Sequence, residues 1–119
     1  MYSNEIVCKI LNYIDININK KITIEEISLR FSYNRYYIMK LFKKEIGISL
    51  FDYINKLRVY NSIKSINNSD ALLIKVAMDN GFYSLEYYSE IFKKVTGVSP
   101  SIYKKFYFRF YNSIIHNYI

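Results

Sequence analysis

The sequence has few of the residues that cross-link a chain, bind metal ions or interrupt helices. Its 119 residues include one cysteine, Cys8, so no disulfide can form within the chain, and a reducing cytoplasm is the expected compartment. Its one histidine, His116, is far from Cys8 in the sequence, and two such distant ligands cannot build a zinc site. Cys8 itself lies in an apolar segment, so we expect it to be a small core residue.

Long hydrophobic runs are also missing. No stretch approaches the length of a membrane span, and the N-terminus lacks the basic region followed by an apolar run that is typical of a signal peptide. The sequence contains no nucleophile paired with a base, no set of metal ligands and no phosphate-binding loop. We therefore expect no catalytic residue, no metal, no cofactor and no membrane partner.

Basic residues are in clear excess. Lysine and arginine number 17 against 10 acidic residues, which gives a formal net charge of +7. A surplus of this size in a small protein indicates an anionic partner, for which nucleic acid and acidic membrane surfaces are the two usual candidates. The alternative, which the charge favours less, is a soluble basic protein that has neither partner.

Helix-breaking residues are scarce, with three glycines and one proline, and the apolar spacing is helical almost throughout. The spacing predicts an all-α chain of seven helices. Capping residues mark several of the helix starts, and glycines mark several of the ends. The predicted helices cover about residues 4–16, 24–31, 35–46, 50–66, 72–80 and 85–96, and the last begins at about residue 100.

The second half of the chain repeats the first at an offset of 50 residues. Phe42-Lys43-Lys44 recurs as Phe92-Lys93-Lys94, and Gly47 recurs as Gly97. A repeat this long indicates two copies of one supersecondary unit. Each copy is a short helix, a tight turn and a longer helix, which is the helix-turn-helix arrangement, at about 24–46 and 72–96. A helical bundle with duplicated hairpins and no DNA role is the alternative.

Together, these segments resemble the DNA-binding domain of the AraC/XylS family of bacterial transcription regulators. The resemblance covers about residues 22–105. It depends on Tyr37–Gly47, Tyr53-Ile54, Leu57-Arg58, Ile74–Ala77, Gly81-Phe82, Tyr88-Ser89, Phe92–Lys94, Gly97–Pro100 and Tyr103. It implies one homeodomain-like domain over residues 1–119, with a linker helix at about 50–66 between the two helix-turn-helix units. It also implies promoter binding, contact with RNA polymerase and an activator.

The third helix has one face suited to packing and one suited to DNA. Its apolar positions recur at helical spacing, and the opposite face carries Arg35, Tyr36, Met39, Lys40 and Lys43. The resemblance places base contacts at Tyr36, Met39 and Lys40. Arginine and lysine can donate to guanine, and Tyr36 and Met39 can touch thymine methyl groups. Lys43 and Lys44 are expected to contact phosphates, although each cation could equally be a solvated surface charge.

The corresponding face of the sixth helix is less suited to DNA. The expected DNA-facing residues there, with the cap that precedes them, are Ser84, Leu85, Glu86, Ser89, Glu90 and Lys93. The resemblance implies an uncharged residue at Glu86 and a basic one at Glu90. Two carboxylates repel phosphate, although a glutamate can accept from cytosine N4. We expect this unit to bind weakly, through helix termini, Tyr83, Ser84 and Lys93, unless its face contacts another protein.

The linker helix and the tail complete the expectations. A linker of about 25 Å would let one chain contact two successive major grooves, roughly 34 Å apart, at an asymmetric site. The tail at 106–119 is unusually apolar, and it is either a longer final helix packed on the core or a homodimer surface. The leading hypothesis is a DNA-binding regulator. The alternative is a protein-interaction module of the same fold that antagonises other regulators.

Overall fold

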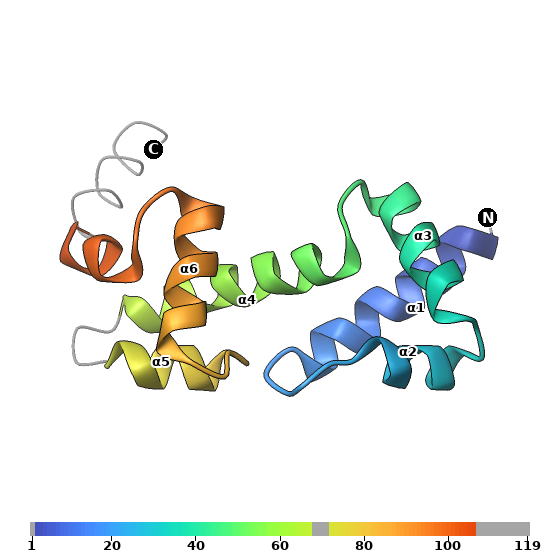
Figure 1. Cartoon of the computed structure of the whole chain (residues 1–119), viewed down its shortest axis with the longest axis horizontal. Helices are drawn as coiled ribbons and strands as arrows, with labels where there is room; N and C mark the ends of the chain where they lie inside the picture. The colour runs from blue at the N-terminus through green and yellow to red at the C-terminus, as the bar shows by residue number, and fades with distance from the viewer. Residues whose placement is uncertain (1, 68–71, 107–119) are drawn as a thin grey trace. The chain divides into compact units, whose positions relative to one another are not determined.

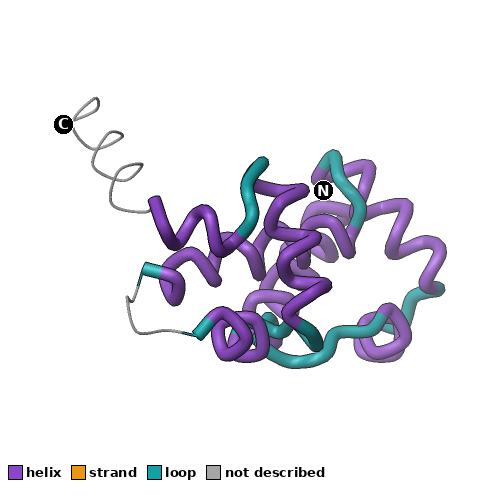
Figure 2. Tube along the Cα trace, turned by 60° about the vertical axis from the view of Figure 1, so that its left-hand side comes forward, coloured by secondary structure: helices purple, strands orange, loops and turns teal. Residues whose placement is uncertain are grey.

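The described part of the chain consists of helices joined by loops. The computed structural model describes residues 2–67 and 72–106, and no strand occurs within those ranges (Figure 2). Figure 1 labels six helices, and residues 100–106 add a further helical segment. The labelled helices are α1 Tyr2–Asn17, α2 Ile24–Phe31, α3 Arg35–Ile46, α4 Leu50–Ile66, α5 Leu73–Asp79 and α6 Leu85–Thr96. The prediction of an all-α fold is confirmed.

The chain divides within α4 into two compact units, Met1–Arg58 and Val59–Ile119. Each unit has its own hydrophobic core and contains one helix-turn-helix. The predicted apolar tail lies outside the described residues, apart from Phe106 at its start. Among the described residues, no helix has the length and apolar character needed to cross a membrane.

The core of the first unit is built mainly from isoleucines. In α1 the buried side chains of Ile10 and Ile14 lie one helical turn apart, so they form a single apolar stripe. Both α1 and α2 pack against α3. The buried core comprises Ile10, Ile14, Ile18, Ile22, Ile24, Ile27, Ile38, Phe42, Leu50 and Ile54. This core orients α3, because one side of that helix is buried in it.

Cys8 lies on the solvent side of α1, so the prediction that it is a core residue was wrong. Two residues along an α-helix turn the chain by about 200°. Cys8 stands two residues before the fully buried Ile10 and therefore faces away from the core. The apolar neighbours that suggested burial belong to the other side of the same helix.

Arg58 joins the end of the first unit to the loop after α1. Its Nε donates to the carbonyl oxygen of Ile18 at 3.0 Å, and one terminal guanidinium nitrogen donates to the carbonyl oxygen of Lys20 at 2.7 Å. These carbonyls lie beyond the end of α1, where a helix no longer supplies hydrogen-bond donors. The side chain of Arg58 thus replaces those donors from a position about 40 residues further along the chain.

The core of the second unit surrounds a buried tyrosine. Tyr88 of α6 is fully buried, and its hydroxyl donates to Ser62 Oγ of α4 at 2.8 Å. Ser62 Oγ in turn donates to the carbonyl oxygen of Val59 at 2.7 Å. Burial raises the pKa of Tyr88 to about 12, so the phenol keeps its proton at neutral pH. The core residues are Val59, Ile66, Val76, Ala77, Phe82, Tyr88 and Phe92.

Side chains and glycines set the ends of the two longer helix-turn-helix helices, as the sequence predicts. Asn34 Oδ1 accepts the second backbone N–H of α3 at 2.8 Å, and Ser84 Oγ accepts the third backbone N–H of α6 at 3.0 Å. The same helices end at Gly47 and Gly97, whose φ angles of +94° and +89° are left-handed. The predicted bounds of α3 and α6 are therefore confirmed by the caps that were used to predict them.

Candidate nucleic-acid interface

Each unit folds a short helix, a turn and a longer helix into the predicted arrangement. In the first unit the turn after α2 passes through Ser32, which has a left-handed φ of +56°. In the second unit the turn after α5 passes through Gly81, with a φ of +88°. The left-handed residue reverses the chain in both turns, and Asn34 or Ser84 then starts the longer helix. These longer helices, α3 and α6, are the two candidate recognition helices.

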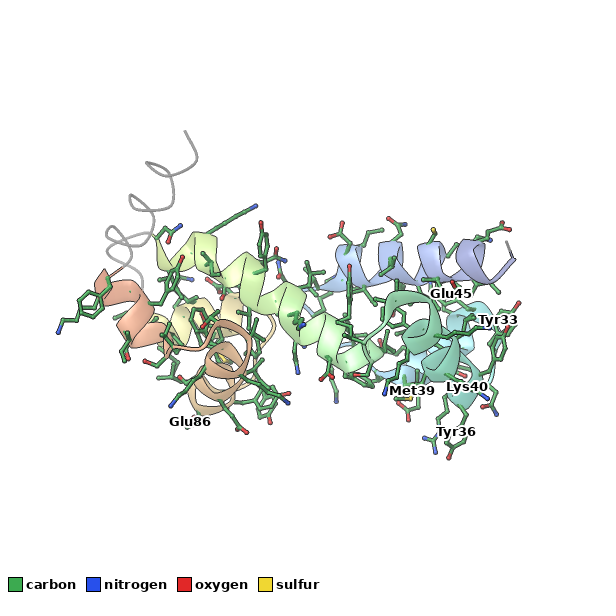
Figure 3. The ribbon with its side chains drawn as sticks, turned by 90° about the horizontal axis from the view of Figure 1, so that it is seen from above. Tyr33, Tyr36, Met39, Lys40, Glu45 and Glu86 are labelled. Atoms are coloured by element: carbon green, nitrogen blue, oxygen red, sulfur yellow. The ribbon has the colours of Figure 1, made fainter. Side chains whose placement is uncertain are left out.

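The outer face of α3 combines exposed cations with an exposed tyrosine. Tyr36 is 68% exposed, and Lys40 is also exposed. Figure 3 shows Tyr36, Met39 and Lys40 on the side of α3 that faces away from α1. Ile38 and Phe42 are fully buried on the other side. The prediction of one packing face and one open face is confirmed.

Met39 is less available than the sequence suggested, because it is partly buried and packs against the core of the first unit. It lies between the two faces of α3, next to the buried Ile38 in sequence and beside the exposed Lys40. Part of its side chain remains accessible.

Arg35 is held against its neighbours at the start of α3. One guanidinium nitrogen lies 3.4 Å from Glu25 Oε1, and another donates to the Tyr36 hydroxyl at 3.1 Å. The guanidinium carbon also lies 5.0 Å from the centre of the Tyr36 ring. The hydrogen bond to Tyr36 raises the pKa of Arg35. An ion pair this exposed contributes little stability, so Arg35 can exchange Glu25 for another anion.

The two recognition helices differ in charge. Helix α3 has four basic residues and one acidic residue, for a net charge of +3. Helix α6 has two of each, Glu86 and Glu90 against Lys93 and Lys94, for a net charge of zero. All four of these α6 side chains are exposed. Its carboxylates lie in the first half of α6 and its lysines in the last turn, so the N-terminal part that would approach bases is the acidic part.

Two of the residues predicted for the α6 surface have structural roles. Leu85 is partly buried and packs against the core of the second unit, so its placement on the exposed face was wrong. Leu85 is the first residue of α6, and helical side chains point back toward the N-terminus of their helix, so exposure of the α6 face further along does not extend to this position. Ser84 uses its hydroxyl as the cap of α6. Ser89 is half-buried.

Sequence reasoning named Tyr83 as a DNA contact but missed that stacked tyrosine pairs lie beside both turns. The rings of Tyr33 and Tyr37 stack with centroids 5.2 Å apart, and those of Tyr83 and Tyr87 stack at 5.0 Å. The offset of 50 residues relates the first pair to the second. The repeat therefore contained the signal, but the pairing of the rings becomes visible only in the structure.

Comparison with known proteins gives consistent matches. A family profile described as "Helix-turn-helix domain" matches residues 27–105. The HTH-type transcriptional activator AarP of Providencia stuartii is 25% identical over 103 residues, which cover 87% of this chain and 76% of AarP. The chain spans only about a third to a half of several other curated relatives.

Solved structures show the same fold. The C-terminal domain of AraT, a response regulator from Geobacillus stearothermophilus, matches with a TM-score of 0.79 and 26% identity, and the match covers 84% of each chain. The DNA-binding domain of AdpA, solved in complex with a target DNA, matches with a TM-score of 0.78. It is 20% identical, and the match covers 85% of this chain and 91% of that one.

Proposed function

Because the chain belongs to the AraC/XylS family of helix-turn-helix transcription regulators, we propose that it binds double-stranded promoter DNA sequence-specifically and activates transcription. The observation that supports this most directly is the outer face of α3. Tyr36 and Lys40 are exposed there, while the opposite face is fixed in the core. A helix held in this way can enter a major groove without reorganising, and Tyr36, Met39 and Lys40 then contact bases.

The remaining cations of α3 contact the DNA backbone in this proposal. Lys43 and Lys44 lie in the last turn and are both exposed. Contacts to phosphates position the helix and add affinity without distinguishing sequences. Arg35 contacts a phosphate or a guanine after exchanging Glu25 for DNA.

The two units act as one DNA-binding domain in this proposal, with α3 as the stronger contact. Helix α4 has 17 residues, which corresponds to a length of about 25 Å. With the widths of the helices added, α3 and α6 are proposed to enter successive major grooves, roughly 34 Å apart. A single chain then binds an asymmetric site. Helix α6 contributes weakly through Ser89 and Lys93, because Glu86 and Glu90 repel phosphate. RNA polymerase is the proposed protein partner.

A second candidate function is supported by the acidic half of α6. Glu86 and Glu90 are exposed at the positions where the first unit has Tyr36 and Lys40. A protein-interaction module of this fold could use them to bind a basic partner and antagonise other regulators. The two functions differ in one measurable property, because only the regulator has high affinity for a particular DNA sequence at physiological salt.

The proposal is tested by selecting bound duplexes from a random pool and measuring affinities by fluorescence anisotropy. Lys40→Ala should weaken binding to the selected duplex by about 5- to 150-fold, since it removes a base contact. Glu90→Ala should bind equally well or more tightly, because it removes a charge that repels phosphate.

The opposite outcomes are equally clear. If every duplex binds at about 10⁻⁴ to 10⁻⁶ M at physiological salt, the chain is a non-specific binder and the regulator proposal is wrong. A large loss of affinity in Glu90→Ala would mean that α6 makes a base contact through that carboxylate. Lys9→Ala is a suitable control, because Lys9 lies on α1, outside both helix-turn-helix units, in a salt bridge with Glu5.

A further inference from the structure

Two stacked tyrosine pairs occupy the same place in both helix-turn-helix units. Tyr33 and Tyr83 each stand immediately before the cap of a recognition helix, and their partners Tyr37 and Tyr87 are the third residue of that helix. The rings are nearly parallel, with interplanar angles of 25° in the first pair and 19° in the second. Each outer tyrosine is thereby fixed on the first turn of α3 or α6.

The backbone of the first pair is also held in place. The N–H of Tyr33 donates to the carbonyl oxygen of Ser28 at 3.2 Å. The hydroxyl of Ser28 donates back to the carbonyl oxygen of Tyr33. This reciprocal contact fixes the turn on which the ring stands. A group that is already ordered loses little conformational entropy when it binds a ligand.

The outer tyrosines are accessible despite this order. Tyr33 is 39% exposed and Tyr83 is 75% exposed. Within the described ranges, no protein group forms a hydrogen bond with either hydroxyl. A phenol hydroxyl is a hydrogen-bond donor, and the neighbouring helix N-terminus adds a partial positive charge. The acceptor that best suits such a hydroxyl is a single anionic oxygen.

We propose that each stacked pair is a phosphate-binding site, in which the hydroxyl of the outer tyrosine, Tyr33 or Tyr83, donates to a DNA phosphate oxygen. The inference rests on the proposed function, since it needs DNA at the recognition helices. The first helix of a helix-turn-helix crosses the DNA backbone, so the turn that follows it lies beside phosphates. In the second unit the contact is most useful, because α6 has no net charge with which to attract the backbone.

A neutral donor leaves a distinct experimental signature. Lysine and arginine that neutralise phosphates release condensed cations, and this release makes the affinity depend on salt. A tyrosine hydroxyl adds affinity without neutralising charge. Its loss should therefore lower the affinity by a similar factor at every salt concentration and for every DNA sequence.

The test uses Tyr33→Phe and Tyr83→Phe in the full chain, which keep the rings and remove only the hydroxyls. Anisotropy is measured between 50 and 200 mM salt, on a selected duplex and on a scrambled one. Each variant should lose affinity by about fivefold to tenfold on both duplexes, with an unchanged salt slope. Lys43→Ala should make the plot of log affinity against log salt concentration less steep, by about 0.9. The control is Tyr60→Phe. Tyr60 lies on α4 and is 67% exposed, and it stacks on no other ring in the described part of the chain.

Three results would overturn the inference. Wild-type affinity in both variants would mean that the hydroxyls do not touch DNA. A loss confined to the selected duplex would indicate a base contact, and a changed slope would indicate an effect on charged groups. If wild type binds the two duplexes equally, the proposed sequence-specific function is wrong. The contribution of the two hydroxyls can still be measured on that non-specific binding, so the two failures are distinguishable.

Discussion

The hydrogen bond between Tyr88 and Ser62 should contribute measurably to the stability of the second unit. Both side chains are fully buried, and Ser62 Oγ accepts from the Tyr88 hydroxyl while donating to the Val59 carbonyl. In Tyr88→Phe, Ser62 still donates to the Val59 carbonyl oxygen, so the free energy of unfolding should fall by only about 1 kcal/mol. In Ser62→Ala the phenol hydroxyl is left buried without its partner, and the cost should rise to about 2–3 kcal/mol.

A double-mutant cycle isolates this bond. The double variant contains no unpaired hydroxyl, so it should be less destabilised than the sum of the two single variants, by about 1 kcal/mol. The assay is urea unfolding followed by far-UV circular dichroism, on wild type and the three variants. Additive costs would refute the reasoning, because they would mean that the two hydroxyls do not stabilise one another in solution.

The raised pKa of Tyr88 predicts that the folded chain loses stability at alkaline pH. Its pKa is raised to about 12 in the folded chain by burial, whereas an unfolded tyrosine has a pKa of about 10. The unfolded chain therefore releases this proton first as the pH rises. The stabilisation is complete below pH about 10 and decreases by about 1.4 kcal/mol per pH unit until the folded phenol titrates. Subtracting the Tyr88→Phe unfolding curve from the wild-type curve should isolate this slope, and parallel curves would contradict it.

Three other substitutions have defined outcomes in urea unfolding. Gly47→Ala should cost about 1 kcal/mol from its left-handed φ alone, because nothing lies within 4 Å of an added Cβ; a neutral result would mean that the turn adopts another φ. Arg58→Ala should lower the free energy of unfolding by about 2–3 kcal/mol, because both hydrogen bonds to carbonyl oxygens are lost. Arg58→Lys should lower it by less, and equal losses in the two variants would contradict the two-carbonyl contact. Asn34→Ala should cost about 1 kcal/mol as a lost cap of α3, whereas Asn34→Ser should be nearly neutral.

Most of the fold could be predicted because its signals are local. The starts of α3 and α6 depend on Asn34 and Ser84, and their ends depend on Gly47 and Gly97, all within one turn of the helix concerned. Helix α5 shows the limit of this approach. Its cap position is Leu72, which makes no side-chain hydrogen bond, and the helix begins one residue later than predicted.

The features that escaped prediction are contacts between distant parts of the sequence. Arg58 is separated by about 40 residues from the carbonyls that it contacts, and Tyr88 by 26 residues from Ser62. Charge and helical period indicate that a side chain is exposed, but not which neighbour it meets. The pairing of Arg35 with Glu25 is of this kind, since the two lie on different helices of the first unit.

The exposure of Cys8 gives this protein a natural attachment point for a fluorescent probe. Cys8 is the one cysteine in the sequence, and it lies on the outer side of α1, opposite the isoleucines that pack inward. A maleimide dye would therefore label one defined position without any engineered substitution and without entering the core. Rapid-mixing fluorescence could then follow the association and dissociation of a duplex with the native side chains of both recognition helices in place.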